Sequence, residues 1–157
     1  MDFFEVIKKR HCCRSFKAKQ PVADDLIEKI IAAGKAAPSA GGIYPIDFLV
    51  IKDEKTKEKI SEICGAFNQS FMNDAPLLII IIGDVEKAAS HYGERGRDLY
   101  LIQDGAAAAE NAFLAATALG LGCCWIGAFD EDRLKEILKL KPNQRPMVIF
   151  PIGYQKE

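Results

Sequence analysis

Residues 8–16, KKRHCCRSF, place a histidine and two adjacent cysteines between Arg10 and Arg14. Three kinds of chemistry are conceivable for this cluster. A zinc site is disfavoured, because zinc-binding cysteines are normally separated by a few residues so that the loop can wrap the ion. A Cys–His nucleophile remains open, since neighbouring arginines favour the thiolate, although adjacent residues seldom aim their side chains at each other. The third possibility is an anion site, in which both guanidinium groups converge on one phosphate.

A second unusual segment is APSAGGIYP, residues 37–45, in which small residues lie between two prolines. Such residues let backbone N–H groups approach a flat ligand closely, whereas the alternative interpretation is an ordinary turn that ends a helix. Neither the dinucleotide-binding pattern G-x-G-x-x-G nor the P-loop pattern G-x-x-x-x-G-K-[ST] occurs in the chain. A nucleotide would therefore have to be bound by residues outside these two motifs.

The five cysteines are expected to be free thiols. Their odd number and their clustering as Cys12–Cys13, Cys64 and Cys123–Cys124 make a poor disulfide framework. Small buried cysteines commonly fill core space, and we expect this role for Cys13, Cys64 and one member of the Cys123–Cys124 pair. No export leader is recognisable at the N-terminus, which predicts a reducing, cytoplasmic compartment in which thiols persist.

Length and composition predict one domain over residues 1–157, because 49% hydrophobic residues are enough for a single core. A formal net charge of −1, from 21 basic and 22 acidic residues, gives no reason to expect nucleic acid or an anionic membrane as the main partner. The longest apolar run, around residues 75–83, is much shorter than the about 20 residues that span a bilayer as a helix. It predicts a buried strand and no membrane partner.

The spacing of apolar residues predicts helices that alternate with short strands, and hence an α+β (mixed α/β) fold with a central mixed sheet of about four or five strands. Asp2 is a good N-cap for the first helix. The abundant alanines between residues 97 and 120 would let another helix approach closely, so that helix is expected to be buried. The expected helices are 2–10, 23–37, 54–65, 97–120 and 130–140, and the expected strands or extended segments are 47–52, 77–83, 123–128 and 147–153.

Four segments, taken in order, resemble motifs of the FMN-dependent nitroreductase family. Residues 10–16, R-H-C-x-R-x-F, resemble R-[RH]-S-x-[RK]-x-F, and APSAGGIYP resembles A-P-S-x-x-N-x-Q-P. FNQSFMNDAP, residues 67–76, resembles the segment that supplies an amide side chain to the flavin. GLGCCWIGAFDEDRLKEIL, residues 120–138, resembles G-L-G-T-C-W-I-G-A-F followed by a helix. Each motif alone is weak, but together they cover nearly the whole chain.

The resemblance implies a nitroreductase-like fold and an intertwined homodimer with FMN at its subunit interfaces. It further implies hydride transfer from NADH or NADPH through the flavin, in a ping-pong cycle, to a nitroaromatic, a quinone or another small electron acceptor. Because the flavin carries this chemistry, no catalytic side chain and no metal are expected. Two alternatives stay open: a flavoenzyme of the same fold with another redox reaction, such as substrate oxidation or reductive dehalogenation, and a non-catalytic flavin-binding protein.

Position by position, the resemblance implies that residues 10–12 surround the phosphate and ribityl chain. Arg14 would reach the pyrimidine edge, where a cation stabilises negative charge on the reduced flavin. Residues 38–42 would come from the partner subunit, Asn68 would bond the N3 and O4 edge, and residues 125–127 would lie near N5. The implied cofactor-binding residues are Arg10, His11, Cys12, Arg14, Pro38, Ser39, Ala40, Gly42, Asn68, Trp125, Ile126 and Gly127.

Departures from the motifs predict altered binding. Cys12 stands where the family usually has a serine. A thiol donates to phosphate less well than a hydroxyl, and the loss is about 1 kcal/mol if no backbone amide compensates. Gly42 and Tyr44 stand where many relatives have asparagine and glutamine, so acceptor contacts in this loop are expected to differ. The sequence ends shortly after Lys156, the one candidate for the basic tail of many relatives, and we therefore expect looser FMN binding.

Overall fold

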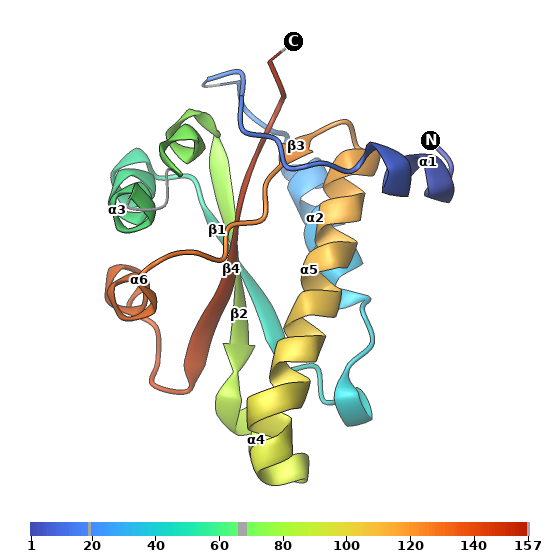
Figure 1. The fold of residues 1–157 in the computed structure, drawn as a ribbon, viewed down its shortest axis with the longest axis vertical. Helices are drawn as coiled ribbons and strands as arrows, with labels where there is room; N and C mark the ends of the chain where they lie inside the picture. Colours follow the sequence, from blue (N-terminus) through green and yellow to red (C-terminus); the bar gives the residue numbers. More distant parts are fainter. Residues whose placement is uncertain (19, 66–68, 157) are drawn as a thin grey trace.

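The structure, a computed structural model, describes residues 1–18, 20–65 and 69–156. Short helices and strands alternate along the chain, and a helix pair covers each face of the sheet (Figure 1). The α-helices are α1 (Phe3–Lys9), α2 (Asp24–Lys35), α3 (Glu54–Cys64), α4 (Val85–Arg95), α5 (Leu101–Ala118) and α6 (Glu131–Leu138). The strands are β1 (Ile46–Ile51), β2 (Leu77–Asp84), β3 (Gly122–Cys123) and β4 (Gln144–Gly153). The remaining helical turns are η1 (Ala40–Gly42), η3 (Ser70–Asp74) and the π-helical η4 (Gly96–Tyr100).

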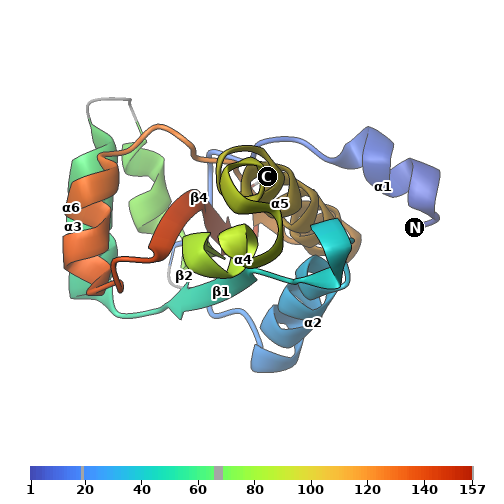
Figure 2. The same ribbon diagram turned by 90° about the horizontal axis from the view of Figure 1, so that it is seen from below.

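The sheet has four strands in the order β1-β2-β4-β3, and all pairs of these strands are antiparallel. The expected α+β class and strand number are confirmed. The parallel part of the expected mixed sheet is reduced, among the described residues, to a single isolated bridge between Cys12 and Cys123. Figure 2 shows helices α2 and α5 on one face of the sheet and α3 and α6 on the other.

Strand β2 is buried on both faces because each face is covered by helices. Its alternating side chains divide between two cores, with Ile79 and Ile81 in the α2–α5 core and Leu78 and Ile80 in the α3–α6 core. The α3–α6 core also contains Ile60, Ile63 and Cys64, as the helical spacing predicts. A continuous isoleucine run is therefore explained by two-sided burial.

The chain between β2 and α5 differs from the prediction. One helix was expected over 97–120, but α4 precedes it and the π-helical turn η4 joins the two. Gly93 has φ 56°, which interrupts the helical path. A Cβ on Gly96 would lie 2.1 Å from the carbonyl oxygen of Ala88, so only glycine permits this close packing. Residues 85–89 are mostly good helix formers, but Gly93 and Gly96 are more typical of a loop, so α4 was not predicted.

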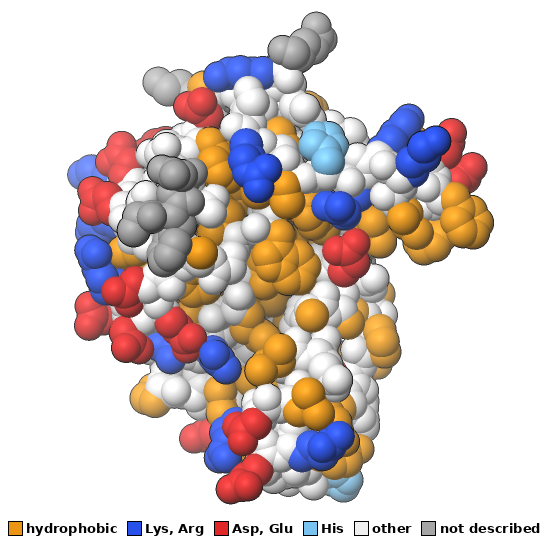
Figure 3. Space-filling model, in the orientation of Figure 1, with side chains coloured by type: hydrophobic (Ala, Val, Ile, Leu, Met, Phe, Trp, Pro, Cys, Tyr) orange, Lys and Arg blue, Asp and Glu red, His pale blue; other side chains and the backbone are white. Residues whose placement is uncertain are grey.

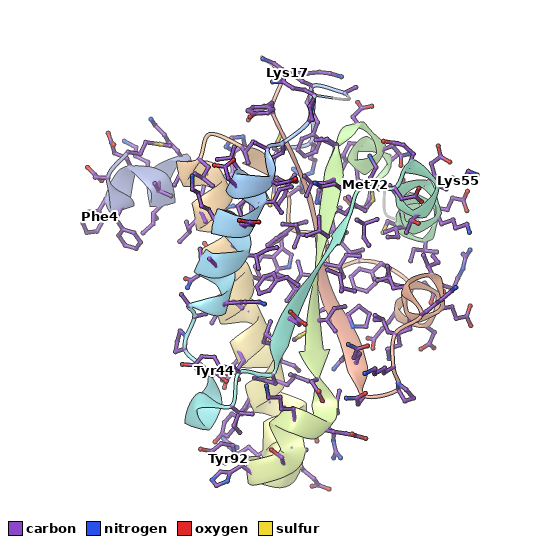
Figure 4. All side chains as sticks on the ribbon, turned by 180° about the vertical axis from the view of Figure 1, so that it is seen from behind. Phe4, Lys17, Tyr44, Lys55, Met72 and Tyr92 are labelled. Atoms are coloured by element: carbon purple, nitrogen blue, oxygen red, sulfur yellow. The ribbon has the colours of Figure 1, made fainter. Side chains whose placement is uncertain are left out.

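Helix α1 projects from the body of the molecule and contacts α5 (Figures 1 and 2). Asp2 and Glu5 cap its start by accepting hydrogen bonds from each other's backbone N–H, at 2.9 and 3.0 Å. Phe3 and Phe4 nevertheless remain 64% and 79% exposed. Figure 4 shows Phe4 at the far end of this projecting helix. Two adjacent exposed phenylalanines are unusual on a surface that has no partner.

No helix within the described ranges is both long and apolar enough to cross a membrane.

Candidate functional site

The first and last predicted binding segments lie side by side at one end of the sheet. The backbone N–H of Cys13 donates to the carbonyl oxygen of Cys123 at 2.8 Å, and Cys12 forms the parallel bridge with Cys123. Further along, Ile126 and Ile149 exchange two backbone hydrogen bonds of 3.0 and 2.9 Å. These contacts hold residues 10–14 next to residues 122–127, as a shared ligand site requires.

A line of aromatic rings connects Arg10 to Trp125. The Arg10 guanidinium lies 5.0 Å from the ring centroid of Phe113, which is 5.5 Å from that of Phe150. Phe150 in turn lies 5.6 Å from Trp125, edge to face. Trp125 is 36% exposed, so this line ends on an accessible aromatic surface. Arg10 and the exposed Trp125 are thus the two ends of one series of aromatic contacts.

Arg10 and Arg14 are available to an anion. Among the described residues, no carboxylate lies within ion-pair distance of either guanidinium. Figure 3 shows basic side chains and a histidine at the top of one face, above hydrophobic side chains in its middle. Two cations without a carboxylate partner in the described part of the chain, one of them over the ring of Phe113, suit a ligand that carries both an anionic and a flat apolar part.

Both ring nitrogens of His11 are already engaged. Nδ1 lies 2.9 Å from the carbonyl oxygen of Lys9, and Nε2 lies 3.0 Å from Oε1 of Gln155. Since both partner atoms accept hydrogen bonds, a protonated ring donates to both, whereas a neutral ring requires the Gln155 amide to turn its NH₂ toward Nε2. His11 is therefore positioned by the backbone and by Gln155, and it is not the base of a Cys–His pair.

The buried cysteines are protonated at neutral pH. Burial raises the pKa of Cys124 to about 12 and that of Cys64 to about 11, and it raises the pKa values of Cys13 and Cys123 as well. All five cysteines are free. Both Cys123 and Cys124 are buried, so the expectation that only one of them fills core space is corrected. No group of three metal ligands occurs among the described residues.

The loop over residues 38–44 is fixed by Asp104 on α5. The Ser39 hydroxyl donates to Asp104 Oδ2 at 2.6 Å, and the Ala40 N–H donates to Oδ1 at 3.1 Å. Ser39 Oγ also accepts from the Tyr44 N–H at 2.9 Å, and Lys87 Nζ donates to the Tyr44 carbonyl at 3.0 Å. These bonds hold Tyr44 at φ 52°, which a non-glycine residue seldom adopts.

Gly41 and Gly42 of the same loop differ in how much space lies beside the backbone. Both have positive φ angles, 60° and 64°. A Cβ on Gly42 would meet only Tyr44 Cε2, at 3.9 Å, so the space beside it is free within the chain. By contrast, a Cβ on Gly41 would lie 2.7 Å from the hydroxyl of Tyr92, because α4 packs against the loop. Gly42 is therefore the point where a flat ligand can approach the backbone.

The loop and the arginine segment lie at different ends of α5. Asp104 holds the loop near the start of this helix, whereas Phe113 contacts Arg10 nine residues later. Nine helical residues correspond to about 14 Å along the axis. Figure 4 agrees, with Tyr44 near the lower end of the molecule and Lys17 at the upper end. A single chain therefore does not bring the two groups of predicted residues together.

Two hollows lie beside the predicted binding residues, one at the loop over residues 38–44 and one at Gly127. A cleft of about 590 Å³ between α2, β1 and α5 is lined by Pro38 and Ser39, but its other lining residues are not among those predicted to bind flavin. A smaller hollow of about 230 Å³ lies beside Gly127 and is also lined by Ile102 and Arg145. Neither hollow is lined by both groups of predicted residues.

Comparison with known proteins places the chain in a family. The nitroreductase family model matches residues 7–68 and 64–154. The chain belongs to the nitroreductase family. It is 34% identical, over 100% of its length and 79% of the relative, to a Methanothermobacter thermautotrophicus protein named as an NADH dehydrogenase/NAD(P)H nitroreductase. A crystal structure of a nitroreductase family protein from Clostridium novyi has a TM-score of 0.88 at 32% identity, over 100% of this chain and 87% of that one. An FMN-dependent nitroreductase from Clostridium difficile has a TM-score of 0.85 at 29% identity, over 99% and 88%.

In this nitroreductase-family chain, Asn68 lies outside the described residues, so its predicted role stays a prediction. Sequence reasoning did not find three supporting residues: Asp104 under the loop, Phe113 under Arg10, and Gln155 beside His11. Asp104 had a detectable signal, because it is an acidic residue directly before the alanine run of a helix that was expected to be buried. The other two contacts depend on tertiary packing and have no local sequence signature.

Proposed function

We propose that two copies of this chain form a homodimer that binds one FMN in each of two interfacial sites and reduces small electron acceptors with NADH or NADPH. Nitroaromatics and quinones are the proposed acceptor classes. Family membership and the likeness to an FMN-dependent nitroreductase of known structure support the proposal. We also propose that residues 1–157 form one domain, since a single sheet separates the two cores.

The observation that carries the proposal is a pair of arginines with no carboxylate partner among the described residues, of which Arg10 is linked to the exposed Trp125 through Phe113 and Phe150. Arg10 is assigned to the phosphate with His11 and Cys12, because a guanidinium offers paired donors to phosphate oxygens. Arg14 is assigned to the pyrimidine edge of the flavin. The residues present therefore fit FMN. The arginine side chains suit its anionic phosphate, and the exposed Trp125 with the open backbone at Gly127 suits its flat ring system.

Two features support the homodimer. The loop with Pro38, Ser39, Ala40 and Gly42 is too far from the arginines along α5 to meet the same flavin within one chain. The exposed phenylalanines of α1 provide an apolar surface for a second copy. The partner's loop would then complete the site that this chain's arginine segment begins.

Bound FMN supplies hydride acceptance from the nicotinamide and electron delivery to the acceptor. The chain's residues bind and orient the cofactor. The Arg14 cation favours the reduced form by stabilising its negative charge. Ile126 N–H already donates to Ile149, which leaves the N–H groups of Trp125 and Gly127 as the candidates to face the flavin from this segment. The flavin chemistry needs no nucleophile from the buried cysteines, which are protonated in the resting protein.

Purified protein is expected to be yellow, with flavin absorption bands, or to take up added FMN to one equivalent per chain. Anaerobic addition of NADH or NADPH should bleach these bands, and an added quinone or nitroaromatic should restore them. If the protein neither retains nor takes up FMN, the proposed function is wrong. Uptake without bleaching by either nicotinamide would instead indicate a non-catalytic flavin-binding protein.

A further inference from the structure

Four of the five cysteines meet where the arginine segment joins β3. Cys12 and Cys123 are bridge partners, and Cys13 N–H donates to Cys123. Cys12 packs against both cores, and Cys124 belongs to the α3–α6 core that Cys12 also contacts. Burial is the main cause of the raised pKa of Cys124, and the nearby Cys12 thiol adds to it. Two segments that are far apart in the sequence therefore present adjacent thiols.

The backbone geometry suits a cross-link between Cys12 and Cys124. Cys12 lies opposite Cys123, so its Cα is one strand spacing away from Cys123 and, diagonally, about 6 Å from the Cα of Cys124. Disulfides usually join Cα atoms about 4.4–6.8 Å apart. Cys12 is half-buried, so a small oxidant can reach it, whereas Cys124 is buried behind it.

The other cysteines are poorer partners. The Cys13 thiol donates to the carbonyl oxygen of Ser15 at 3.3 Å and packs with Phe16 and Ala75 in a separate cluster. Cys123 is almost completely buried in the α2–α5 core, although it lies opposite Cys12 in the bridge, so a Cys12–Cys123 cross-link is the competing outcome that the test must distinguish. Cys64 is buried on α3 in the same core as Cys124, but it lies outside the bridge between the arginine segment and β3. Cys64 is therefore a matched control.

We propose that Cys12 and Cys124 form a reversible disulfide when the protein meets a peroxide. The peroxide oxidises Cys12 Sγ to a sulfenic acid and releases one water. Cys124 Sγ then bonds to Cys12 Sγ, and the sulfenic hydroxyl leaves with the Cys124 proton as a second water. Two thiols thus lose two electrons to one peroxide molecule. A dithiol reductant restores both thiols by exchange.

A second part of the inference rests on the proposed function. If FMN covers Cys12, bound FMN shields this thiol from the oxidant. Saturating FMN is then expected to slow disulfide formation about tenfold, because only the small FMN-free fraction reacts. Oxidation in turn blocks the phosphate end of the site, so the oxidised protein should bind FMN less tightly than the reduced protein.

The test treats the purified full chain with hydrogen peroxide, with and without saturating FMN. Free thiols are then alkylated, and the digested protein is mapped by mass spectrometry. We expect loss of two of the five thiols, a cross-linked peptide pair that joins Cys12 to Cys124, and full recovery with dithiothreitol. Five intact thiols, or a cross-link between a different pair, would overturn the proposal.

Three variants sharpen the test. Cys12→Ser and Cys124→Ala should each abolish the cross-link, whereas Cys64→Ala should leave it in place. Because Cys124 is buried, circular dichroism checks that its variant folds, and Cys12→Ser gives the same answer at a half-buried position. A cross-link that forms equally fast with saturating FMN would support the cysteine pair but contradict the placement of Cys12 in the flavin site.

Discussion

Replacing Arg14 with alanine is expected to slow reduction of bound FMN by NADH or NADPH about tenfold to a hundredfold. Hydrogen bonds to charged groups contribute about 1.5–3 kcal/mol, and each 1.4 kcal/mol or so corresponds to a factor of ten. The fold should change little, since Arg14 is exposed and has no carboxylate partner among the described residues. Anaerobic stopped-flow absorbance measures the reduction rate.

Two substitutions separate a specific role of Arg14 from general effects of charge. Arg14→Lys keeps the cation but loses the planar pair of donors, so it should fall between the native protein and Arg14→Ala. Arg133→Ala removes an exposed arginine from α6, away from the site, and should leave the reduction rate unchanged. Equal rates for Arg14→Ala and the native protein would remove Arg14 from its proposed role.

The double substitution Phe3→Glu/Phe4→Glu is expected to convert the proposed dimer to a monomer and to abolish FMN binding. Burial of each phenylalanine contributes about 1.5–3 kcal/mol, and a twofold dimer buries each side chain twice. The loss of about 6–12 kcal/mol is comparable with the whole binding energy of a micromolar dimer, about 8 kcal/mol. Sedimentation velocity measures the mass, and flavin absorbance of the same fractions measures FMN.

The conservative variant Phe4→Leu is the control for this prediction, because it keeps an apolar side chain at the end of α1 and should remain dimeric. The folded monomer should retain its secondary structure, since both phenylalanines are exposed in the single chain. A dimer that persists in the double glutamate variant would show that α1 is not part of the interface.

Much of the fold was predictable because its signals are local. Asp2 predicted the start of α1, and the isoleucine run predicted the buried strand β2. The antiparallel pairing of the strands was harder to predict from the sequence, since strand direction depends on how the helices cross between strands. Helix α4 was missed although residues 85–89 are mostly good helix formers, because Gly93, which has a positive φ, and Gly96 are more typical of a loop.

For the site, the residue types were predictable, but their arrangement was not. The motifs identified Arg10 and Trp125, and the structure places both at one end of the sheet. The role of Asp104 in holding Ser39 and Ala40 is a long-range contact, which no spacing rule reveals. The cysteines attracted attention as a possible metal or nucleophile, whereas burial makes most of them protonated core residues.

The central claim is that each FMN site combines the arginine segment of one subunit with the loop of the other. It can be tested with one chain that carries Arg10→Ala/Arg14→Ala and another that carries Gly42→Asp. Aspartate tolerates the positive φ of Gly42, and the space there is open, so the substitution adds a negative charge beside the ligand while the chain folds. Gly42→Asn is its uncharged control.

Each variant alone should bind FMN weakly in its homodimer. The deciding measurement is the FMN content of heterodimers that are isolated through a different affinity tag on each chain. A site shared between subunits predicts one tightly bound FMN per heterodimer, because one site then carries both defects and the other carries neither. If each site lay within one chain, both sites of the heterodimer would be damaged, and the absence of tightly bound FMN would contradict the account.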